Sequence, residues 1–538
     1  MNSMDKDNKP AGKKPYASKP GNRPAPKPGE KRDFSHGEKR GPYGKPAGRS
    51  GEKSFGKPAG KPEGRFSRPQ NGKTGQKPFS RKPDAKPAPD PNAPSSLSRK
   101  VALQIFQDVV RKDAYAALSL DDRMKDTNLS QLDKRFCASI VYTTLENLIR
   151  IDYVLSFFLK DAENLEPTVR DVLRISVCQL LFHDRVPENA VVDEAVKLVR
   201  GAGLEGLTGL TNAVLRSVVR GKDEIKWPAK EEGAKYLSIM YSVPLWLAER
   251  ILAAYGEDLA EKICAFRTES HYTVIRPNMM KLTDDQFEAL LGKKVWDVEK
   301  GAVPHAYRVR RAAEIAQDAD YFNGSFSIQG ESSMLAAQAV DVKRGMQVLD
   351  CCAAPGGKSA YLAEAMAGTG RVYAWDVHEH RVTLIKAAMR RLRLENVRPV
   401  VRDASVIKED LIGTMDAVLL DAPCSGLGVM DNKPDIKYRA TPESVKELTG
   451  IQEKLLNTCC QYVKRGGTLV YSTCSILPEE NGEQIRKFLS AHPDFALAPL
   501  PDSFDERFKT HYSENGLQLL PHRDGVEGFF IARMRRIK

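Results

Sequence analysis

The first 96 residues of the chain contain no leucine, isoleucine or valine. The same stretch holds 17 of the 33 prolines, together with many glycine and lysine residues. A segment of this composition cannot bury enough apolar surface to offset the entropy of its chain, so it is not expected to fold. We therefore predict a disordered, basic, Pro/Gly/Lys-rich tail over residues 1–95, followed by a long folded region.

Long apolar runs and paired cysteine motifs are also missing. No run of about 18 apolar residues is present, which argues against a transmembrane helix, and the N-terminus lacks the apolar core of a secretory signal. The nine cysteines include no C-x-x-C pair of the kind that binds zinc, and they suggest no disulfide framework. These absences favour a protein of the reducing cytoplasm with no membrane partner and no metal, and we expect a monomer.

The positive charge of the chain is concentrated in the tail. The net charge is +13, and residues 1–95 hold 23 Lys and Arg against 9 Asp and Glu, a balance of +14. The remaining residues are nearly neutral, with 60 basic and 61 acidic side chains. Because single aromatic rings such as Tyr16 and Phe34 lie among the basic residues, the tail is suited to bind the phosphates and unpaired bases of RNA. A tail that only improves solubility is the alternative.

Residues 96–225 have the apolar spacing of a helical bundle. Apolar residues recur three and four positions apart in four stretches, 136–149, 169–181, 191–199 and 213–218. The segments 187–196 and 211–216 resemble the NusB-type RNA-binding helical domain, and a generic docking bundle is the alternative. Residues 226–320 predict a small α+β connector module, with a helix that runs to about Tyr255.

Residues 321–538 alternate short apolar strands with helical stretches. The expected strands are 347–349, 372–375, 399–401, 417–420 and 468–471. Such alternation predicts a mostly parallel sheet with helices on both faces. The fold class is therefore multidomain, with an α/β Rossmann-like domain that has a seven-stranded sheet and follows the all-α domain and the α+β connector. Residues 525–533 are expected to form a hairpin that closes the sheet.

A Gly-rich turn follows the first of these strands and is typical of a nucleotide-type cofactor site. Asp376 ends the second strand, where a carboxylate can accept both ribose hydroxyls, and Asp403 follows the third, where it suits an adenine amino group. Pro355 and Lys358 stand in the turn in place of G-x-G-x-x-G, which favours S-adenosylmethionine over NAD. The alternative is that each acid only caps the next helix. The expected cofactor residues of the turn are Cys352, Ala353, Ala354, Pro355, Gly356, Gly357 and Lys358.

Two cysteines, Cys424 and Cys474, each lie just past an apolar, strand-like run. A thiolate that adds to C6 of cytosine makes C5 nucleophilic enough to take a methyl group, and a second thiol can assist the elimination that follows. Asp421 lies where it could donate a proton to N3 and contact the cofactor, and Lys358 is a cation that could favour a thiolate. The residues alone do not say which cysteine attacks. The interpretation as small buried apolar groups is kept for Cys137, Cys178, Cys264, Cys459 and Cys460.

Taken together, these motifs resemble the RNA cytosine-C5 methyltransferases of the NOL1/NOP2/Sun family. The matching segments are 326–329, 352–358, 403–405, 421–426 and 472–481. The resemblance covers about 321–538 and implies an S-adenosylmethionine-dependent methyltransferase domain. It also implies that Cys474 is the nucleophile and that Cys424 assists release.

The segment 433–439 and the NusB-like front domain are similar to a bacterial branch of this family that methylates one cytosine of 16S rRNA before the small subunit assembles. The resemblance therefore implies small-subunit rRNA as the partner. Gly330 departs from the acid that is frequent in the family, and Asp431 and Asn432 depart from its basic residues. The same chemistry on tRNA or another rRNA site is an alternative, as is a non-catalytic RNA-binding assembly factor.

Overall fold

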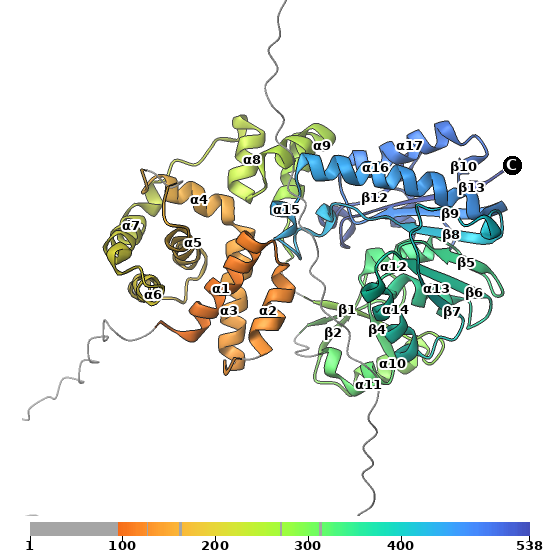
Figure 1. Cartoon of the computed structure of the whole chain (residues 1–538), viewed down its shortest axis with the longest axis horizontal. Coiled ribbons are helices and arrows are strands. Elements are labelled where there is room, and N and C mark those ends of the chain that lie inside the picture. The colour runs from red at the N-terminus through yellow and green to blue at the C-terminus, as the bar shows by residue number, and fades with distance from the viewer. Residues whose placement is uncertain (1–94, 126, 161–163, 269–271, 311–314) are drawn as a thin grey trace, which may run out of the picture. The chain divides into compact units, whose positions relative to one another are not determined.

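The computed structural model in Figure 1 describes residues 95–538 except 126, 161–163, 269–271 and 311–314. The predicted tail, apart from Ser95, therefore lies outside the described residues. The described chain from residue 95 onward belongs to one compact unit. Along this unit a helical region, a connector and an α/β region follow one another.

The first region is a bundle of seven helices around a single apolar core. Its helices are α1 (Leu97–Lys112), α2 (Ala116–Lys125), α3 (Gln131–Glu146), α4 (Leu148–Ser156), α5 (Pro167–Phe182), α6 (Glu188–Gly201) and α7 (Thr208–Gly221). Local signals set their ends: Pro167 occupies the first turn of α5, and the Glu166 carboxylate accepts the Val169 amide at 2.8 Å. All four predicted helical stretches lie within α3 to α7, which confirms the all-α prediction.

The connector begins with helices and continues as a four-stranded antiparallel sheet in the order β2-β3-β1-β4. Its elements are α8 (Ala234–Tyr241), α9 (Leu245–Ala265), β1 (Thr273–Pro277), α10 (Asp284–Leu291), β2 (Asp297–Lys300), β3 (Tyr307–Arg310), α11 (Ala319–Phe322) and β4 (Phe326–Ile328). Helix α9 is kinked at Gly256, where φ is +72°, so the predicted end near Tyr255 marks the kink and not the end of the helix.

A mixed sheet of nine strands forms the frame of the α/β region, with the main order β11-β12-β13-β9-β8-β5-β6-β7 and β10 paired to β13. The strands are β5 (Gln347–Asp350), β6 (Arg371–Asp376), β7 (Val397–Val401), β8 (Met415–Asp421), β9 (Val463–Thr473), β10 (Phe495–Leu497), β11 (Tyr512–Ser513), β12 (Gly516–Leu519) and β13 (Phe529–Arg536). Strands β5 to β9 are parallel, which confirms the Rossmann-like fold class.

The end of the chain differs from the predicted hairpin. Residues 525–528 form a loop, and β13 lies between β9 and the preceding strand β12. The prediction was wrong because residues 525–528 only lead into β13. They do not form a turn between two strands within 525–533. The short strands β10 and β11 bring the expected seven strands to nine.

Helices pack on both faces of this sheet, as Figure 1 shows for α13 and α14 on one side and α16 and α17 on the other. Successive strand residues alternate between two cores, because Val348 contacts the first pair of helices and Leu349 the second. The helices of this region are α12 (Glu331–Gln338), α13 (Gly357–Ala365), α14 (Glu379–Leu392), α15 (Ile436–Arg439), α16 (Pro442–Cys459), α17 (Gly482–Ala491), α18 (Glu506–Lys509) and α19 (Pro521–Asp524). Of the helices in the described residues, none is both long and apolar enough to span a bilayer.

Candidate active site

A cavity of about 570 Å³ opens where the carboxyl ends of the parallel strands meet, which is where open α/β sheets bind ligands. Its lining includes Asp376 after β6, Asp403 after β7 and Asp421 at the end of β8. Cys424 and Cys474 line the same cavity, three residues after the end of β8 and directly after the end of β9, respectively. The structure thus brings together, in one pocket, three acids and two thiols that lie up to 98 residues apart in the sequence.

The Gly-rich turn between β5 and α13 lies at the floor of this cavity. Gly356 has φ of +107°, and a Cβ at this position would come within 3.3 Å of side chains of α14. Only glycine therefore fits the turn. Cys352 and Ala354 line the cavity, whereas Ala353, Pro355, Gly356, Gly357 and Lys358 are not part of its lining.

Asp350, at the end of β5, is fully buried behind the turn. Its Oδ2 accepts a hydrogen bond from Ser359 Oγ at 2.6 Å, and its Oδ1 has no hydrogen-bond partner among the described residues. Burial raises the pKa of this carboxyl to about 7, although the Ser359 hydrogen bond and Lys358 oppose the shift. A carboxyl in this state holds its proton near neutral pH and gives the turn a polar floor.

Asp376 and Asp403 both have local backbone partners. Asp376 is buried and accepts the His378 amide at 3.1 Å, and Asp403 accepts the Ser405 amide at 2.8 Å. Hydrogen bonds from Ser405 lower the pKa of Asp403, which keeps it ionised. These backbone contacts agree in part with the alternative that each acid caps the next helix, but both carboxylates also line the cavity.

Three basic side chains at this cavity were not predicted as site residues from the sequence. Arg381, on α14, lies 3.4 Å from Asp376 Oδ2, and Arg402 precedes Asp403. Lys454 lines the cavity from α16. The sequence predicts helical stretches in this region but does not show which side of this helix faces the cavity. All three place positive charge around the acids that the sequence did identify.

The two cysteines are in direct contact. Their Sγ atoms lie 3.2 Å apart, and the Cys474 amide lies 3.2 Å from Cys424 Sγ. Both are free thiols. Strands β8 and β9 are neighbours in the parallel sheet, so residues just past their ends necessarily converge.

The surroundings of the two thiols differ. The hydrogen bond from Cys424 lowers the pKa of Cys474, and the cations of Lys358 and Lys433 lower it further against burial and Asp421. The same hydrogen bond, together with burial and the carboxylate of Glu480, raises the pKa of Cys424 well above the ordinary value of a thiol. Cys474 is therefore the more easily ionised thiol of the pair.

Lys358 reaches the cavity's edge from the first turn of α13 and pairs with Asp421. Its Nζ lies 2.6 Å from Asp421 Oδ2, and Ser472 Oγ donates to Asp421 Oδ1 at 2.8 Å. Burial disfavours the ammonium, but the attraction of Asp421, with a smaller effect of Asp350, raises the pKa of Lys358. The pair is thus a fixed cation and carboxylate beside Cys474.

Glu480 holds the loops of both cysteines and was not singled out as a site residue. Its fully buried carboxylate accepts the Ser425 amide at 2.9 Å and the Ser425 hydroxyl at 2.5 Å, and it also accepts the Ser475 hydroxyl. Gln452 Nε2 donates to the same carboxylate at 3.0 Å. Because Ser425 and Ser475 directly follow the two cysteines, Glu480 fixes the distance between the thiols. Its signal in the sequence was its place in the segment 472–481.

The remaining cysteines are in other environments. Cys137, Cys178, Cys264 and Cys460 are buried, and burial raises the pKa of each thiol to about 12. Such thiols stay protonated and pack as small apolar groups, in agreement with the prediction made for them.

The segment 433–439 does not line this cavity. Lys437 is buried and donates to the Glu146 carbonyl at 2.9 Å, Asp435 accepts the Ala116 amide at 3.4 Å, and Tyr438 packs against the core of the helical bundle. This segment therefore joins the loop that follows Cys424 to the helical region.

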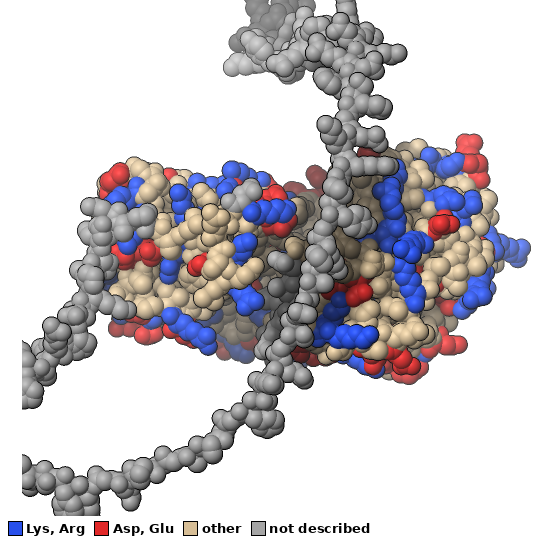
Figure 2. Space-filling model, turned by 90° about the horizontal axis from the view of Figure 1, so that it is seen from below, with Lys and Arg blue, Asp and Glu red and all other residues tan. Residues whose placement is uncertain are grey.

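Basic side chains on the surface supply an electrostatic path for a polyanion. Figure 2 shows, on the face seen there, Lys and Arg side chains gathered over part of the surface rather than evenly mixed with acidic ones. Helix α14, which borders the cavity, exposes Arg381, Lys386 and Arg390, followed by the exposed Arg393. Such a cluster is typical of a surface that contacts nucleic-acid phosphates.

Residues 337–535 match the family described as 16S rRNA methyltransferase RsmB/F, and residues 96–220 match the NusB family, which confirms both resemblances predicted from the sequence. A "probable ribosomal RNA small subunit methyltransferase B" of Bacillus subtilis is 37% identical over 440 residues, which cover 81% of this chain and 98% of the relative. A protein of the same description from Synechocystis sp. is 30% identical over 444 residues, 82% of this chain and 99% of its own. The crystal structure of PH0851 has a TM-score of 0.69 at 28% identity and covers 82% of this chain and 99% of its own. The chain therefore belongs to the family of ribosomal RNA small subunit methyltransferases B.

Proposed function

We propose that the protein is a 16S rRNA (cytosine-C5)-methyltransferase that uses S-adenosylmethionine and forms a covalent bond between a cysteine and C6 of the target base. The observation that carries this proposal is the pair of thiols, 3.2 Å apart, in the same cavity as the carboxylates of Asp376 and Asp403. A thiolate and an adjacent thiol are what addition to the base and later elimination require.

The donor set of the cavity fits an adenosine cofactor. Asp376 would hold the ribose hydroxyls and Asp403 the adenine amino group, and the turn at Gly356 lets the main chain of residues 351–354 approach closely. When bound, S-adenosylmethionine supplies an electrophilic methyl group. The volume of about 570 Å³ is within the usual range of about 300–1,000 Å³ for small-molecule sites.

Cys474 is the nucleophile in this proposal. Its thiolate forms a bond to C6, and the electron pair of the C5–C6 double bond moves so that C5 can accept the methyl group. As the ring gains negative charge, N3 takes up a proton from the pair of Lys358 and Asp421, whose Nζ and Oδ2 lie 2.6 Å apart, and it returns this proton when the product forms. Loss of the C5 proton then restores the double bond and breaks the bond between sulfur and C6, so Cys474 leaves as a thiolate.

Cys424 serves the release step. We assign it to this step because its Sγ lies 3.2 Å from Cys474 Sγ, next to the bond that must break, so that it can accept the C5 proton directly or through a relay. A group that accepts this proton must start as a base. Because Cys474 is bonded to C6 at this stage, Cys424 acts once its own proton has passed to solvent. Glu480 keeps it in place through Ser425.

The substrate is assigned from the relatives and from charge. The curated relatives are described as acting on small-subunit ribosomal RNA, and the front region of the chain matches the NusB family. We propose that this chain binds the same RNA through its helical region and basic surface, as a monomer in the cytoplasm. The target base must be unpaired or flipped to reach Cys474, since that side chain is only partly exposed within the cavity.

Covalent trapping tests the proposal. Wild type, Cys474→Ala and Cys424→Ala are incubated with S-adenosylmethionine and small-subunit rRNA, and protein–RNA adducts are separated on a denaturing gel. We expect adducts to accumulate only with Cys424→Ala and methyl transfer to vanish with Cys474→Ala. Cys264→Ala, a buried thiol of α9, is the matched control and should behave as wild type. Absence of methyl transfer by the wild type to any RNA would contradict the proposal.

A further inference from the structure

A second cavity, of about 710 Å³, lies between the connector and the α/β region. Its walls come from the end of α9, from Tyr272 and Arg308 of the connector, from Asp431 and Asn432, and from residues 521–527. None of these residues lines the cavity that holds the cysteines. The second cavity therefore has no role in the candidate active site described above.

This cavity is directly connected to the loops of the two cysteines. The Gly428 amide donates to the Cys474 carbonyl at 2.9 Å, and the Gly528 amide donates to the Gly428 carbonyl at 2.9 Å. Gly428 lies between Cys424 and Asp431 in the chain, and Gly528 follows the wall residue Glu527. Main-chain hydrogen bonds through Gly428 and Gly528 thus link the wall of the second cavity to Cys474.

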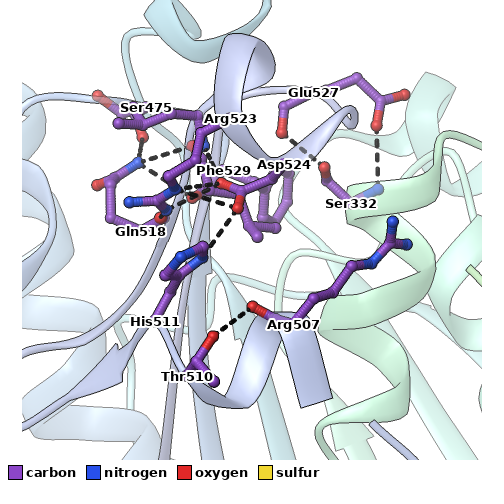
Figure 3. A network of polar contacts seen from close by, with 12 residues as sticks. Ser332, Ser475, Arg507, Thr510, His511, Gln518, Arg523, Asp524, Glu527 and Phe529 are labelled. Carbon is purple, nitrogen blue, oxygen red and sulfur yellow. Dashed lines mark hydrogen bonds and ion pairs between the residues drawn. The ribbon is translucent and has the colours of Figure 1, made fainter. Parts of the chain in front are cut away.

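A network of polar contacts holds the wall at 521–527 (Figure 3). Asp524 is buried, accepts the Leu520 amide at 2.7 Å and pairs with His511 at 3.0 Å. Gln518 Nε2 donates to the Ser475 carbonyl at 3.2 Å, next to Cys474. Because both ends of this wall are fixed, the cavity has a defined shape in relation to the active site.

The far side of the wall is fixed by Glu527. Its Oε2 accepts the Ser332 amide at 3.0 Å and its carbonyl accepts the Ser332 hydroxyl at 2.6 Å, as Figure 3 shows. A Cβ at Gly330 would overlap Glu527 Oε1. Glycine at position 330 therefore makes room for this carboxylate at the edge of the cavity.

Several polar atoms of the lining are not paired within the described part of the chain. Asp431 Oδ2 accepts from Thr268 Oγ1 at 2.7 Å, but Oδ1 is buried and has no partner there. Both ring nitrogens of His522 are likewise buried and unpaired among the described residues. Burial and Arg523 lower the pKa of His522, so its ring is neutral and offers one donor and one acceptor. Unpaired buried polar atoms cost free energy unless a ligand satisfies them.

The rest of the lining suits an aromatic ring attached to a phosphate. Phe266, Tyr272 and Val526 supply apolar surface, and the Arg308 guanidinium lies 4.9 Å from the centre of the Tyr272 ring. Lys262 is exposed at the cavity and carries positive charge. Planar side chains of this kind bind unpaired RNA bases by stacking on their outer faces, together with hydrogen bonds to the base edges.

We propose that the second cavity binds a nucleotide of the substrate RNA directly next to the target cytosine, and that the base it prefers is guanine. The acceptors are the carboxylates of Asp431 and Glu527, which line the same cavity. Oδ1 of Asp431 has no partner among the described residues, and Oε2 of Glu527 accepts the Ser332 amide. Guanine presents two adjacent donors, N1–H and the N2 amino group, on one edge, whereas adenine and cytosine present one amino group and uracil one imino group. The inference rests on the proposed function, since it assigns a flanking site to the same RNA substrate.

Short RNAs with one target cytosine test this inference. Each of the four bases is placed in turn at the two flanking positions, and kcat and KM for methyl transfer are measured with the wild type. We expect guanine at one of the two positions to raise kcat/KM about tenfold over the other bases. Inosine, which lacks only the N2 amino group, should lose most of this gain at the same position, and this comparison requires no variant of the protein.

Asp431→Asn, which places an amide in place of the free acceptor, should remove the preference by raising KM for the guanine RNA while kcat stays within about twofold. Asp410→Asn, an exposed acid elsewhere in the α/β region, is the control and should keep the preference. Equal rates for all flanking bases, or an unchanged preference in Asp431→Asn, would overturn the inference alone. If the wild type methylates no RNA, the proposed function fails, and the inference fails with it.

Discussion

The cavity of the cysteines and the second cavity, between the connector and the α/β region, differ in how completely their polar groups are paired. In the cavity of the cysteines, Lys358 is paired with Asp421, Glu480 accepts hydrogen bonds from both cysteine loops, and the two thiols contact each other. In the second cavity, Asp431 and His522 keep buried atoms with no partner among the described residues. Groups that perform chemistry are oriented in advance by the protein, whereas groups that recognise a ligand leave their hydrogen bonds to it.

Removal of Lys358 is the strongest test of the paired cavity. Lys358→Met leaves Asp421 without its ion pair and removes a cation that lowers the pKa of Cys474. We expect methyl transfer to fall on the order of 100-fold. Because the thiolate then forms only at higher pH, the pH profile of kcat/KM should also shift upward. Lys487→Met, at an exposed position of α17, is the matched control. An unshifted profile in Lys358→Met would contradict the assigned electrostatics.

The protonation of Asp350 tests how strongly burial behind the Gly-rich turn disfavours the charged form of this carboxyl. Its pKa is about 7 in the fold, against about 4 in an unfolded chain, so the native state binds more protons between these values and the free energy of unfolding falls as pH rises through this window. Asp350→Asn should remove this loss and gain about 2 kcal/mol relative to the wild type between pH 5 and pH 8. Chemical denaturation without ligands at both pH values measures it, and parallel pH dependences would contradict the assignment.

Substitution of one carboxylate in each cavity tests whether the two cavities bind different ligands. Asp376→Asn should raise KM for S-adenosylmethionine about tenfold and leave KM for RNA unchanged, because Asp376 is assigned to the ribose hydroxyls. Asp431→Asn should do the reverse. Steady-state kinetics with each substrate varied in turn separates the two effects. If both variants raise the same KM, the cavities do not serve different ligands.

Deletion of residues 1–94 has the smallest expected effect and separates long-range attraction from binding in the cavities. Nearly the whole positive excess of the chain lies in this tail, so its loss should weaken RNA binding a few-fold at low salt and flatten the dependence of affinity on salt. The preference for flanking bases should persist. Filter binding at several salt concentrations provides the measurement, and an unchanged slope would show that the tail does not contact phosphates.

The site residues that could be predicted from the sequence are those at or just beyond the end of a recognisable strand. Asp376, Asp403, Cys424 and Cys474 each follow a recognisable parallel strand, and the topology of such sheets brings strand ends together. Strand alternation and helical spacing likewise sufficed for the fold class and for the helical bundle. The pairing of β12 with β13 was missed, because Gly525 and Gly528 have the composition of a turn and the actual partner strand lies before α19.

The second cavity could not be inferred in the same way. Tyr272, Arg308, Asp431 and His522 belong to four segments with no motif in common, and their proximity depends on how the connector sheet packs against the α/β region. The role of the segment 433–439 was also unpredictable from its charges, since Lys437 is buried against the helical bundle rather than exposed to RNA. Burial of a lysine depends on a carbonyl partner far away in the chain.

The contact of Tyr438 with the helical bundle bears on how the protein is made. The helices that surround this side chain are complete once residue 225 has been synthesised, but the ring that fills their surface emerges roughly 200 residues later. On the ribosome, the first domain must therefore wait with an apolar site uncovered until the catalytic region arrives. A nascent chain that stalls within the connector would leave this apolar site uncovered.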